Sequence, residues 1–140
     1  MGSVLFFFED LPILPELNEH IVEFLNKIIV LEGFTCQSLN YIISTDDYLY
    51  QINVHYLDHH YYTDVITFDN SESPLIISGD IFISLDRVKD NAILHCIPYF
   101  NELLRVMIHG LLHLIGYDDK TSLLKEDMTQ RENFYLDIFA

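Results

Sequence analysis

The chain has 140 residues, half of them hydrophobic, and carries a formal net charge of −15. This length suits one domain that buries about two-thirds of the surface of its unfolded chain, and the apolar, aromatic-rich composition argues against disorder. The acidic balance lacks the basic footprint of most nucleic-acid-binding proteins. Two cysteines, Cys36 and Cys96, cannot form a disulfide framework, and no apolar run reaches the roughly 18 to 20 residues of a membrane span. We therefore expect a soluble cytoplasmic protein with reduced thiols.

Hydrophobic patterning predicts strands and helices that alternate along most of the chain. Runs of apolar and β-branched residues predict strands at residues 3–8, 35–44, 63–68 and 75–84. Apolar residues at three- and four-residue spacing predict helices at residues 15–31, 46–57, 86–96, 99–115 and 123–139. The pattern predicts a single α+β domain over residues 1–140, with a small mixed four-stranded sheet packed with four to five helices.

Local signals refine the ends and faces of these helices. Thr45 is expected to cap the second helix and Asp86 the third. The expected core positions of the last helix are Met128, Phe134, Tyr135 and Ile138. The acidic residues expected on its solvated face are Glu126, Asp127 and Glu132.

One motif in the second half of the chain indicates a function. His109 and His113 are four residues apart, so on a helix their imidazoles project from one face, one turn apart. This is the spacing with which a helix gives two nitrogen ligands to one metal ion. Gly116 can end the helix in a left-handed conformation, and the chain can then return Asp118 or Asp119 toward the same point. The whole reads His-x-x-x-His-x-x-Gly-x-x-Asp, the spacing of the extended zincin motif with Asp in place of the third His.

Two histidines on an apolar helix can also be structural residues of the core. Burying two imidazoles among so many apolar side chains, however, costs free energy unless each ring nitrogen finds a partner. A metal site with the ligands His109, His113 and Asp119 is therefore the preferred interpretation. The residue after the first histidine is Gly110, whereas a zinc peptidase carries a glutamate base there. An ordinary peptidase is thereby disfavoured: either a base comes from elsewhere in the chain, or the ion activates water with little help.

Other polar residues have weaker claims to chemistry. His55 and His59 are also four apart, but His59 lies where the helix pattern fails, and the pair lacks a glycine turn and a third ligand. A solvated face or loop is therefore the better interpretation. Thr63 and Asp64 stand at the start of one predicted strand, and Asp80 stands directly before the apolar part of another. An Asp at such a position is usually a turn or cap residue. The alternative is that one of them lies beside the metal and orients water or a ligand imidazole.

Three segments, in order, resemble the motifs of one family. Residues 109–118, His-Gly-Leu-Leu-His-Leu-Ile-Gly-Tyr-Asp, resemble the signature of the YbeY family of bacterial metal-dependent endoribonucleases. Asn53 followed by residues 63–68 resembles the second motif of that family, and residues 79–84 resemble its third. The histidine motif is fairly specific by itself, and all three in order are highly specific. The resemblance covers residues 35–120 well.

The resemblance implies a single-domain α+β fold, one zinc-like divalent ion held by three side chains, and hydrolysis of single-stranded RNA. It also implies maturation of ribosomal RNA at the 3′ end of the small-subunit RNA, a role in ribosome quality control, and the small ribosomal subunit as a partner, with no DNA and no membrane. Two positions depart from the family pattern. Asp119 stands where the family has a third His, and an oxygen ligand suits manganese or magnesium better than a third imidazole would, so the identity of the metal stays open beside Zn2+. Leu57 stands where the family often has an Arg for phosphate contact.

The leading hypothesis is a metal-dependent endoribonuclease in which His109, His113 and Asp119 hold the ion. Thr63 and Asp64 are the expected catalytic residues in the pocket wall. The acidic charge and the missing arginine keep open a metallohydrolase that acts on another substrate. A third hypothesis is a non-catalytic ribosome-assembly factor in which a closed metal site only ties the helix end to the following loop. The cations nearest the motif in the sequence, which could offset the charge locally, are Arg87, Lys89, Arg105 and Lys120.

Overall fold

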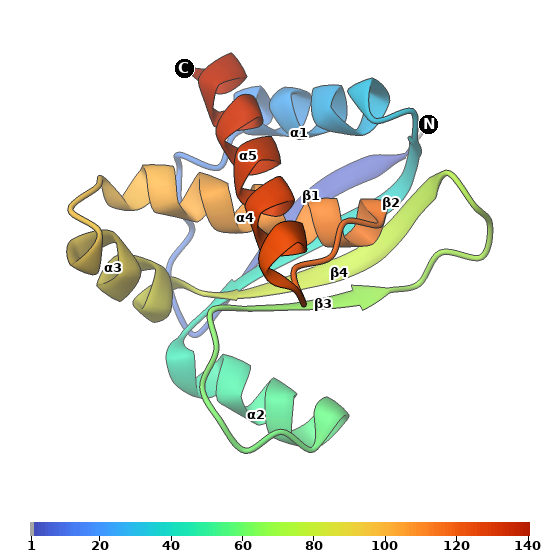
Figure 1. Ribbon diagram of the computed structural model, residues 1–140. Coiled ribbons are helices and arrows are strands. Elements are labelled where there is room, and N and C mark those ends of the chain that lie inside the picture. The colour runs from blue at the N-terminus through green and yellow to red at the C-terminus, as the bar shows by residue number, and fades with distance from the viewer. Residues whose placement is uncertain (1) are drawn as a thin grey trace.

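The computed structural model describes residues 2–140 and contains one four-stranded sheet in the order β1-β2-β4-β3 (Figure 1). The strands are β1 (Ser3–Glu9), β2 (Thr35–Ser44), β3 (Val65–Asp69) and β4 (Ile76–Ser84). β1, β2 and β4 run parallel, and β3 pairs antiparallel with β4, so β1 and β3 are the two edges of the sheet. The predicted α+β class with a small mixed sheet is confirmed.

Five helices pack around this sheet in residues 2–140: α1 (Glu19–Leu31), α2 (Asp46–Leu57), α3 (Leu85–Leu94), α4 (Tyr99–Ile115) and α5 (Ser122–Phe139). α1, α4 and α5 lie on one face of the sheet, α2 lies on the opposite face, and α3 lies beside the start of α4 (Figure 1). α4 is the central helix, because it contacts β3 and β4 as well as α3 and α5. The histidine helix is therefore packed directly on the sheet.

Side-chain caps fix where four of the helices begin. The caps are Asn18 for α1, Thr45 for α2, Ser84 for α3 and Thr121 for α5, and each accepts a hydrogen bond from a backbone N–H of the first turn. Thr45 was predicted correctly. The first helix begins at Glu19 and not at residue 15, because the Asn18 cap defines its start. The prediction that Asp86 caps the third helix is wrong: Asp86 lies in its first turn and accepts a 2.8 Å hydrogen bond from the N–H of Asp46.

The core lies between the sheet and the helices α1 and α4. Met107 and Leu111 of α4 are fully buried in one hydrophobic cluster with Ile81 of β4. Each such side chain contributes about 1.5 to 3 kcal/mol by leaving water. Tyr41 of β2 is also fully buried, and its hydroxyl donates a 2.9 Å hydrogen bond to the carbonyl oxygen of Met107. These contacts fix the rotation of α4, and with it the side on which the two histidines project.

α5 departs most from its predicted packing. Phe134, expected in the core, is 49% exposed, and Glu132, expected on a solvated face, is only 6% exposed. Each residue lies in the environment predicted for the other. The reason is that the face of α5 that packs on α4 includes a polar residue and is not purely apolar. The remaining predictions hold: Glu126 and Asp127 are exposed, Ile138 is half-buried, and Met128 and Tyr135 are buried.

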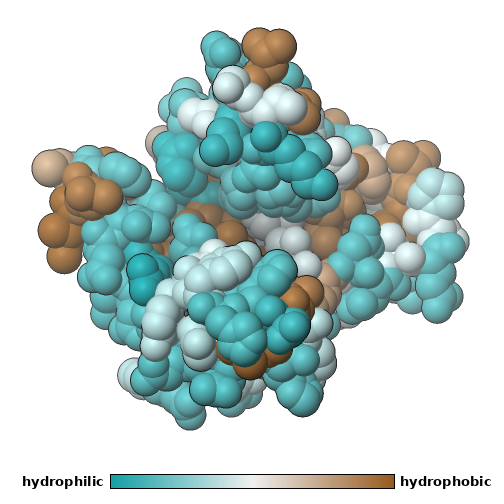
Figure 2. All heavy atoms as spheres, turned by 60° about the horizontal axis from the view of Figure 1, so that its bottom comes forward, coloured by the Kyte–Doolittle hydropathy of each residue, from teal (hydrophilic) through white to brown (hydrophobic). Residues whose placement is uncertain are grey.

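None of the helices in residues 2–140 combines the length and the apolar character needed to cross a bilayer. Cys36 and Cys96 are both free, with Cys96 exposed. In the space-filling view most of the surface is hydrophilic, and hydrophobic side chains are visible in the hollow between the upper and lower parts of the molecule (Figure 2).

Candidate metal centre

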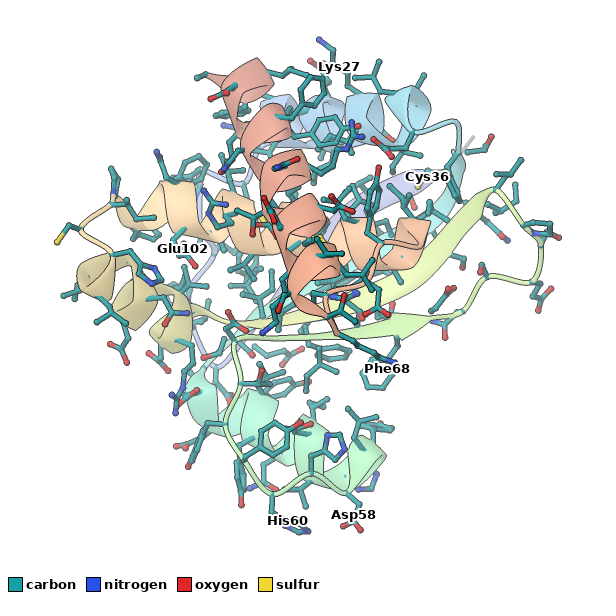
Figure 3. All side chains as sticks on the ribbon, viewed as in Figure 1. Lys27, Cys36, Asp58, His60, Phe68 and Glu102 are labelled. Carbon is teal, nitrogen blue, oxygen red and sulfur yellow. The ribbon has the colours of Figure 1, made fainter. Side chains whose placement is uncertain are left out.

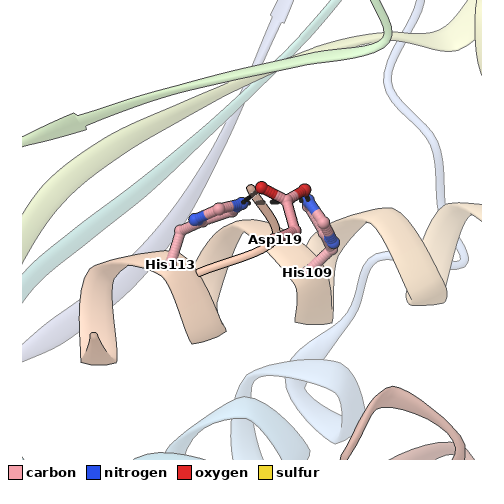
Figure 4. A group of neighbouring side chains, drawn as sticks. All are labelled: His109, His113 and Asp119. Atoms are coloured by element: carbon pink, nitrogen blue, oxygen red, sulfur yellow. Dashed lines mark hydrogen bonds and ion pairs between the residues drawn. The ribbon is translucent and has the colours of Figure 1, made fainter. Parts of the chain in front are cut away.

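His109 and His113 lie in the second half of α4, and their imidazoles project from the same side of the helix (Figure 4). The two Nε2 atoms are 3.1 Å apart, and the ring planes are inclined by 77°. About a quarter of each side chain is exposed. The two nitrogens therefore converge on one point that remains open to solvent.

The turn after α4 reverses the direction of the chain. Gly116 ends the helix with a φ of 126°, a conformation that favours glycine, and the N–H of Tyr117 bonds back to the carbonyl oxygen of Leu112. Asp118 then closes the turn, because its Oδ1 accepts hydrogen bonds from the backbone N–H groups of the next two residues, at 2.6 and 3.1 Å. The carboxylate of Asp118 is thereby engaged by the backbone.

Asp119 is the residue that this turn returns to the histidines. Its Oδ2 lies 3.5 Å from Nε2 of His109, and its Oδ1 lies 3.6 Å from Nε2 of His113. Within residues 2–140, these three side chains form the one group of His, Cys, Asp or Glu that converges at metal-ligand spacing. Of the two aspartates that the spacing left open, the structure brings Asp119 to the pair.

The separations between the three side chains fit a single small divalent ion. Ligand atoms that each lie about 2.0 to 2.2 Å from a tetrahedral ion are roughly 3.3 to 3.6 Å from one another. The two Nε2 atoms are 3.1 Å apart, and each lies 3.5 or 3.6 Å from a different oxygen of Asp119. With one ligand atom taken from each residue, all three atoms lie within 4.8 Å of one another, so small shifts bring them into this range. Three such side chains would fill three of the four positions around a tetrahedral ion and leave one free, which is the pattern of catalytic rather than structural zinc sites.

Gly110 faces the sheet, which explains why no glutamate follows the first histidine. A Cβ atom at this position would lie 2.8 Å from Cγ2 of Ile81 and 3.3 Å from Cγ2 of Thr67. The close approach of α4 to β3 and β4 therefore leaves no room for a side chain there. A glutamate at this position would be directed into the core, so any proton acceptor from the protein comes from another part of the chain.

Glu132 of α5 is the site residue that the sequence did not reveal. Its Oε2 lies 2.7 Å from Nδ1 of His109, and its Oε1 accepts a 3.0 Å hydrogen bond from Nη1 of Arg105. A carboxylate on Nδ1 favours the tautomer in which Nε2 is free to bind a metal ion. The one signal in the sequence is spacing: Glu132 follows Met128 by four residues and precedes Tyr135 by three, on the buried face of α5.

The carboxylates around His109 determine its affinity for a proton. Burial, the largest single influence, by itself lowers the pKa of His109. The hydrogen bond and the charge of Glu132 act in the opposite direction, and the charges of Asp119 and Asp64 add to them. The net result is a raised pKa of His109, so its imidazole holds a proton more readily than a free histidine does. The same negative charges attract a divalent cation, which has to displace that proton on binding.

A small cavity of about 110 Å3 adjoins the histidine helix, and its polar lining residues are Asp64, Glu102, Arg105, His109 and Glu132. Asp64 therefore faces the site from the residue before β3, where the sequence placed a possible catalytic group. Thr63 is half-buried next to it and does not line this cavity. Glu102, labelled in Figure 3, enters from the α3 end of α4. Burial raises the pKa of Glu102, and the charge of Arg105, 4.0 Å away, offsets this only in part.

The rival pair, His55 and His59, is not part of a metal-ligand group in the described residues. Both side chains are exposed, and Nδ1 of His59 is 3.0 Å from the hydroxyl of Tyr61. The loop after α2 that carries His59 lies well away from α4, as the positions of Asp58 and His60 show (Figure 3). His55 lies on an exposed face of α2 and His59 in the loop after it, so the prediction of a solvated face or loop is confirmed.

Asp80 and Arg87 are engaged elsewhere. Asp80 accepts a 3.0 Å hydrogen bond from the side-chain amide of Asn40 and lines a cavity under α2, on the opposite face of the sheet from α4. Of the four cations nearest the motif in the sequence, Arg105 lines the site, whereas Arg87 is paired with Asp46 at 3.0 Å. Arg105 thus offsets part of the negative charge beside His109.

Comparison with known proteins shows which chains this one resembles. The model of the family described as endoribonuclease YbeY matches residues 11–140. The chain is 49% identical over 136 residues to the endoribonuclease YbeY of Cytophaga hutchinsonii, an alignment that covers 97% of this chain and 95% of the relative. It is 39% identical over 135 residues to the endoribonuclease YbeY of Amoebophilus asiaticus, which covers 96% and 92%. The solution structure of TM1509 from Thermotoga maritima matches with a TM-score of 0.69 at 27% identity, covering 96% of this chain and 88% of that one.

Proposed function

The chain belongs to the endoribonuclease YbeY family, and from this premise we propose how its residues serve the cleavage of RNA. Family membership makes the protein a hydrolase, an endoribonuclease that acts in ribosomal RNA processing. It favours this function over a metallohydrolase for another substrate and over a non-catalytic assembly factor.

The observation that carries the proposal is the convergence of His109, His113 and Asp119 at metal-ligand spacing. We propose that these three side chains hold one divalent ion, with zinc as the expected metal. When bound, such an ion acts as a Lewis acid that lowers the pKa of water and polarises a phosphate oxygen. Three protein ligands leave a position for water, which a closed structural site would not do.

The remaining roles fall to two residues that line the cavity beside α4, Glu132 and Asp64, and to Thr63, which precedes Asp64. Glu132 holds His109 in the tautomer that presents Nε2. Asp64, which lines the cavity, is proposed to orient the attacking water and to accept its proton, which Gly110 cannot do. Thr63, next to it in the chain, is proposed to form the wall against which the RNA strand lies.

We propose single-stranded RNA as the substrate, at the 3′ end of the small-subunit ribosomal RNA, with the small ribosomal subunit as the partner. The reaction is assigned to the cytoplasm and to residues 1–140 acting as one metal-dependent hydrolase domain. DNA is not expected to be a substrate. A divalent ion held by the three ligands would favour a substrate that carries phosphates, because it would supply positive charge where a chain of net charge −15 otherwise repels them.

The test is cleavage of a single-stranded fragment from the 3′ end of small-subunit ribosomal RNA by the metal-loaded chain. We expect wild type to cleave it and His113→Ala to be slower by about 100-fold or more, because losing a residue that merely supports a metal ligand already costs 10- to 100-fold. The same sequence as DNA is expected to stay intact. Equal cleavage by wild type and His113→Ala, or none by chains loaded with zinc or manganese, would overturn the proposal.

A further inference from the structure

A larger cavity, of about 450 Å3, lies between α5 and the turn that carries Asp119, and it is lined by Tyr117, Asp127, Gln130, Arg131 and Phe134. The reaction described above uses none of these residues. Resting on the proposed function, we propose that this cavity, called here the Phe134 cavity, binds one nucleotide of the single-stranded RNA substrate outside the metal centre. The base stacks on Phe134, and a neighbouring phosphate bonds to Arg131.

Phe134 has the features of a stacking platform. It is a large aromatic side chain that remains 49% exposed on the surface of α5. Its ring packs against the ring of Tyr135, with centroids 5.1 Å apart and planes inclined by 74°, which orients it without covering it. Proteins that bind single-stranded RNA use such rings because every base has a flat face that can stack on them.

Arg131 is the arginine of this chain with the weakest ion pairing. The other two, Arg87 and Arg105, each lie 3.0 Å from a carboxylate oxygen, whereas the nearest carboxylate to Arg131 is 3.9 Å away. Its guanidinium lies 5.8 Å from the ring centre of Tyr117 and 5.6 Å from that of Phe134. A guanidinium that is oriented by two rings and still 41% exposed is suited to bond a phosphate.

Glu32 at the end of α1 holds the floor of the Phe134 cavity in place. Its Oε1 accepts a 2.8 Å hydrogen bond from the hydroxyl of Tyr117, and its Oε2 accepts one from the hydroxyl of Tyr135. One carboxylate thereby joins α1, the turn after α4, and α5. A cavity that is already formed loses little conformational entropy when a ligand binds.

The Phe134 cavity adjoins the metal centre through two short pieces of chain. Tyr117 precedes Asp119 by two residues, and Arg131 is next to Glu132, whose carboxylate contacts His109. An RNA strand whose scissile phosphate lies at the histidines can therefore continue over α5 into this cavity. Stacking on an exposed ring also provides affinity that does not depend on a basic surface, which this acidic chain lacks.

The first experiment measures binding of a fluorescent single-stranded RNA of about ten nucleotides in excess chelator, where no metal-dependent cleavage takes place. Phe134→Ala is expected to raise Kd about tenfold, the effect of removing one stacking ring. The matched control is Leu123→Ala, which removes another apolar side chain from the same helix, 75% exposed and outside the cavity, and leaves Kd unchanged. Thermal melting of both variants checks that they fold alike.

The second experiment tests the phosphate contact through its salt dependence. Arg131→Gln is expected to reduce the slope of log Kd against log salt by about 0.7, the value for one phosphate contact on a single strand. Lys125→Gln removes a charge from an exposed position of the same helix outside the cavity and should leave the slope unchanged. A slope equal in wild type and Arg131→Gln would contradict the phosphate contact.

An abasic scan of the RNA separates stacking from a general loss of affinity. Wild type should lose affinity most when the base at one position is removed, and Phe134→Ala should show no further loss at that position. If Phe134→Ala binds as tightly as wild type while the metal-loaded wild type cleaves RNA, the Phe134 cavity is not a binding site and the proposed function stands. If the metal-loaded wild type cleaves no RNA, the proposed function fails and the inference fails with it.

Discussion

The two helices that build the candidate metal centre are held in place by different forces. α4 is apolar and buried through most of its length, and it contributes His109 and His113. α5 exposes most of its residues and contributes one buried carboxylate, Glu132, which is tied to α4 through Arg105. The two histidines therefore stand on the helix that the core fixes most firmly. Glu132, which contacts His109, stands on a more exposed helix that is held by fewer apolar contacts and by polar contacts. Changes in α4 should act through folding, and changes in α5 should act through metal affinity.

The largest effect is expected where α4 touches the sheet. Gly110→Glu would place a charged side chain where even a Cβ atom would lie 2.8 Å from Ile81. We therefore expect a loss of about 3 kcal/mol or more in the free energy of unfolding. Urea denaturation followed by circular dichroism measures it. A variant as stable as wild type would show that the core does not fix this helix.

A loss of metal affinity without a loss of fold is expected in α5. Glu132→Ala removes the carboxylate on Nδ1 of His109 and should weaken metal binding by about 10- to 100-fold, as titration calorimetry would show. Glu132→Gln can still accept one hydrogen bond, so its metal affinity should lie between those of wild type and Glu132→Ala. Glu126→Ala, an exposed acidic position of the same helix, is the control and should bind like wild type. Identical affinities for all four proteins would contradict the role of Glu132.

The same difference between the helices decides what could be predicted from the sequence. The bounds of α4 were predicted correctly, because a long apolar segment begins after Pro98 and ends before Gly116. The histidines and Asp119 followed from spacing that a helix and a glycine turn translate directly into proximity. Glu132 could not be predicted in this way, because its contact with His109 spans 23 residues and lies in a helix of largely polar pattern.

Gly116→Ala tests the turn that joins the two helices. The φ of 126° should cost alanine about 1 to 2 kcal/mol, and the strained turn should also move Asp119 and weaken metal binding. Gly33→Ala is a matched control, because Gly33 has a φ of 83° at the end of α1 and equally open surroundings. It should lose stability while metal affinity stays unchanged. Equal metal affinity in both variants would show that the turn does not position Asp119.

Glu102 gives the smallest expected effect, and it depends on pH. Because burial raises its pKa above the ordinary value of 4.5, the contribution of Glu102 to stability is present below that value and is lost as the pH rises through the raised pKa. Glu102→Gln stays neutral, so its stability relative to wild type should increase from about pH 4 to pH 8. Urea denaturation at several pH values measures this. A difference that does not change with pH would contradict it.

The central claim is that Asp119, and not Asp118, completes a three-ligand metal site with the two histidines. The most direct test is metal content by plasma mass spectrometry on untagged protein purified without chelator, comparing wild type, Asp118→Ala and Asp119→Ala. We predict about one equivalent of a divalent metal in wild type and in Asp118→Ala, and its loss in Asp119→Ala. A wild type that binds no metal after supplementation with zinc or manganese, or an Asp119→Ala variant that keeps a full equivalent, would contradict the account.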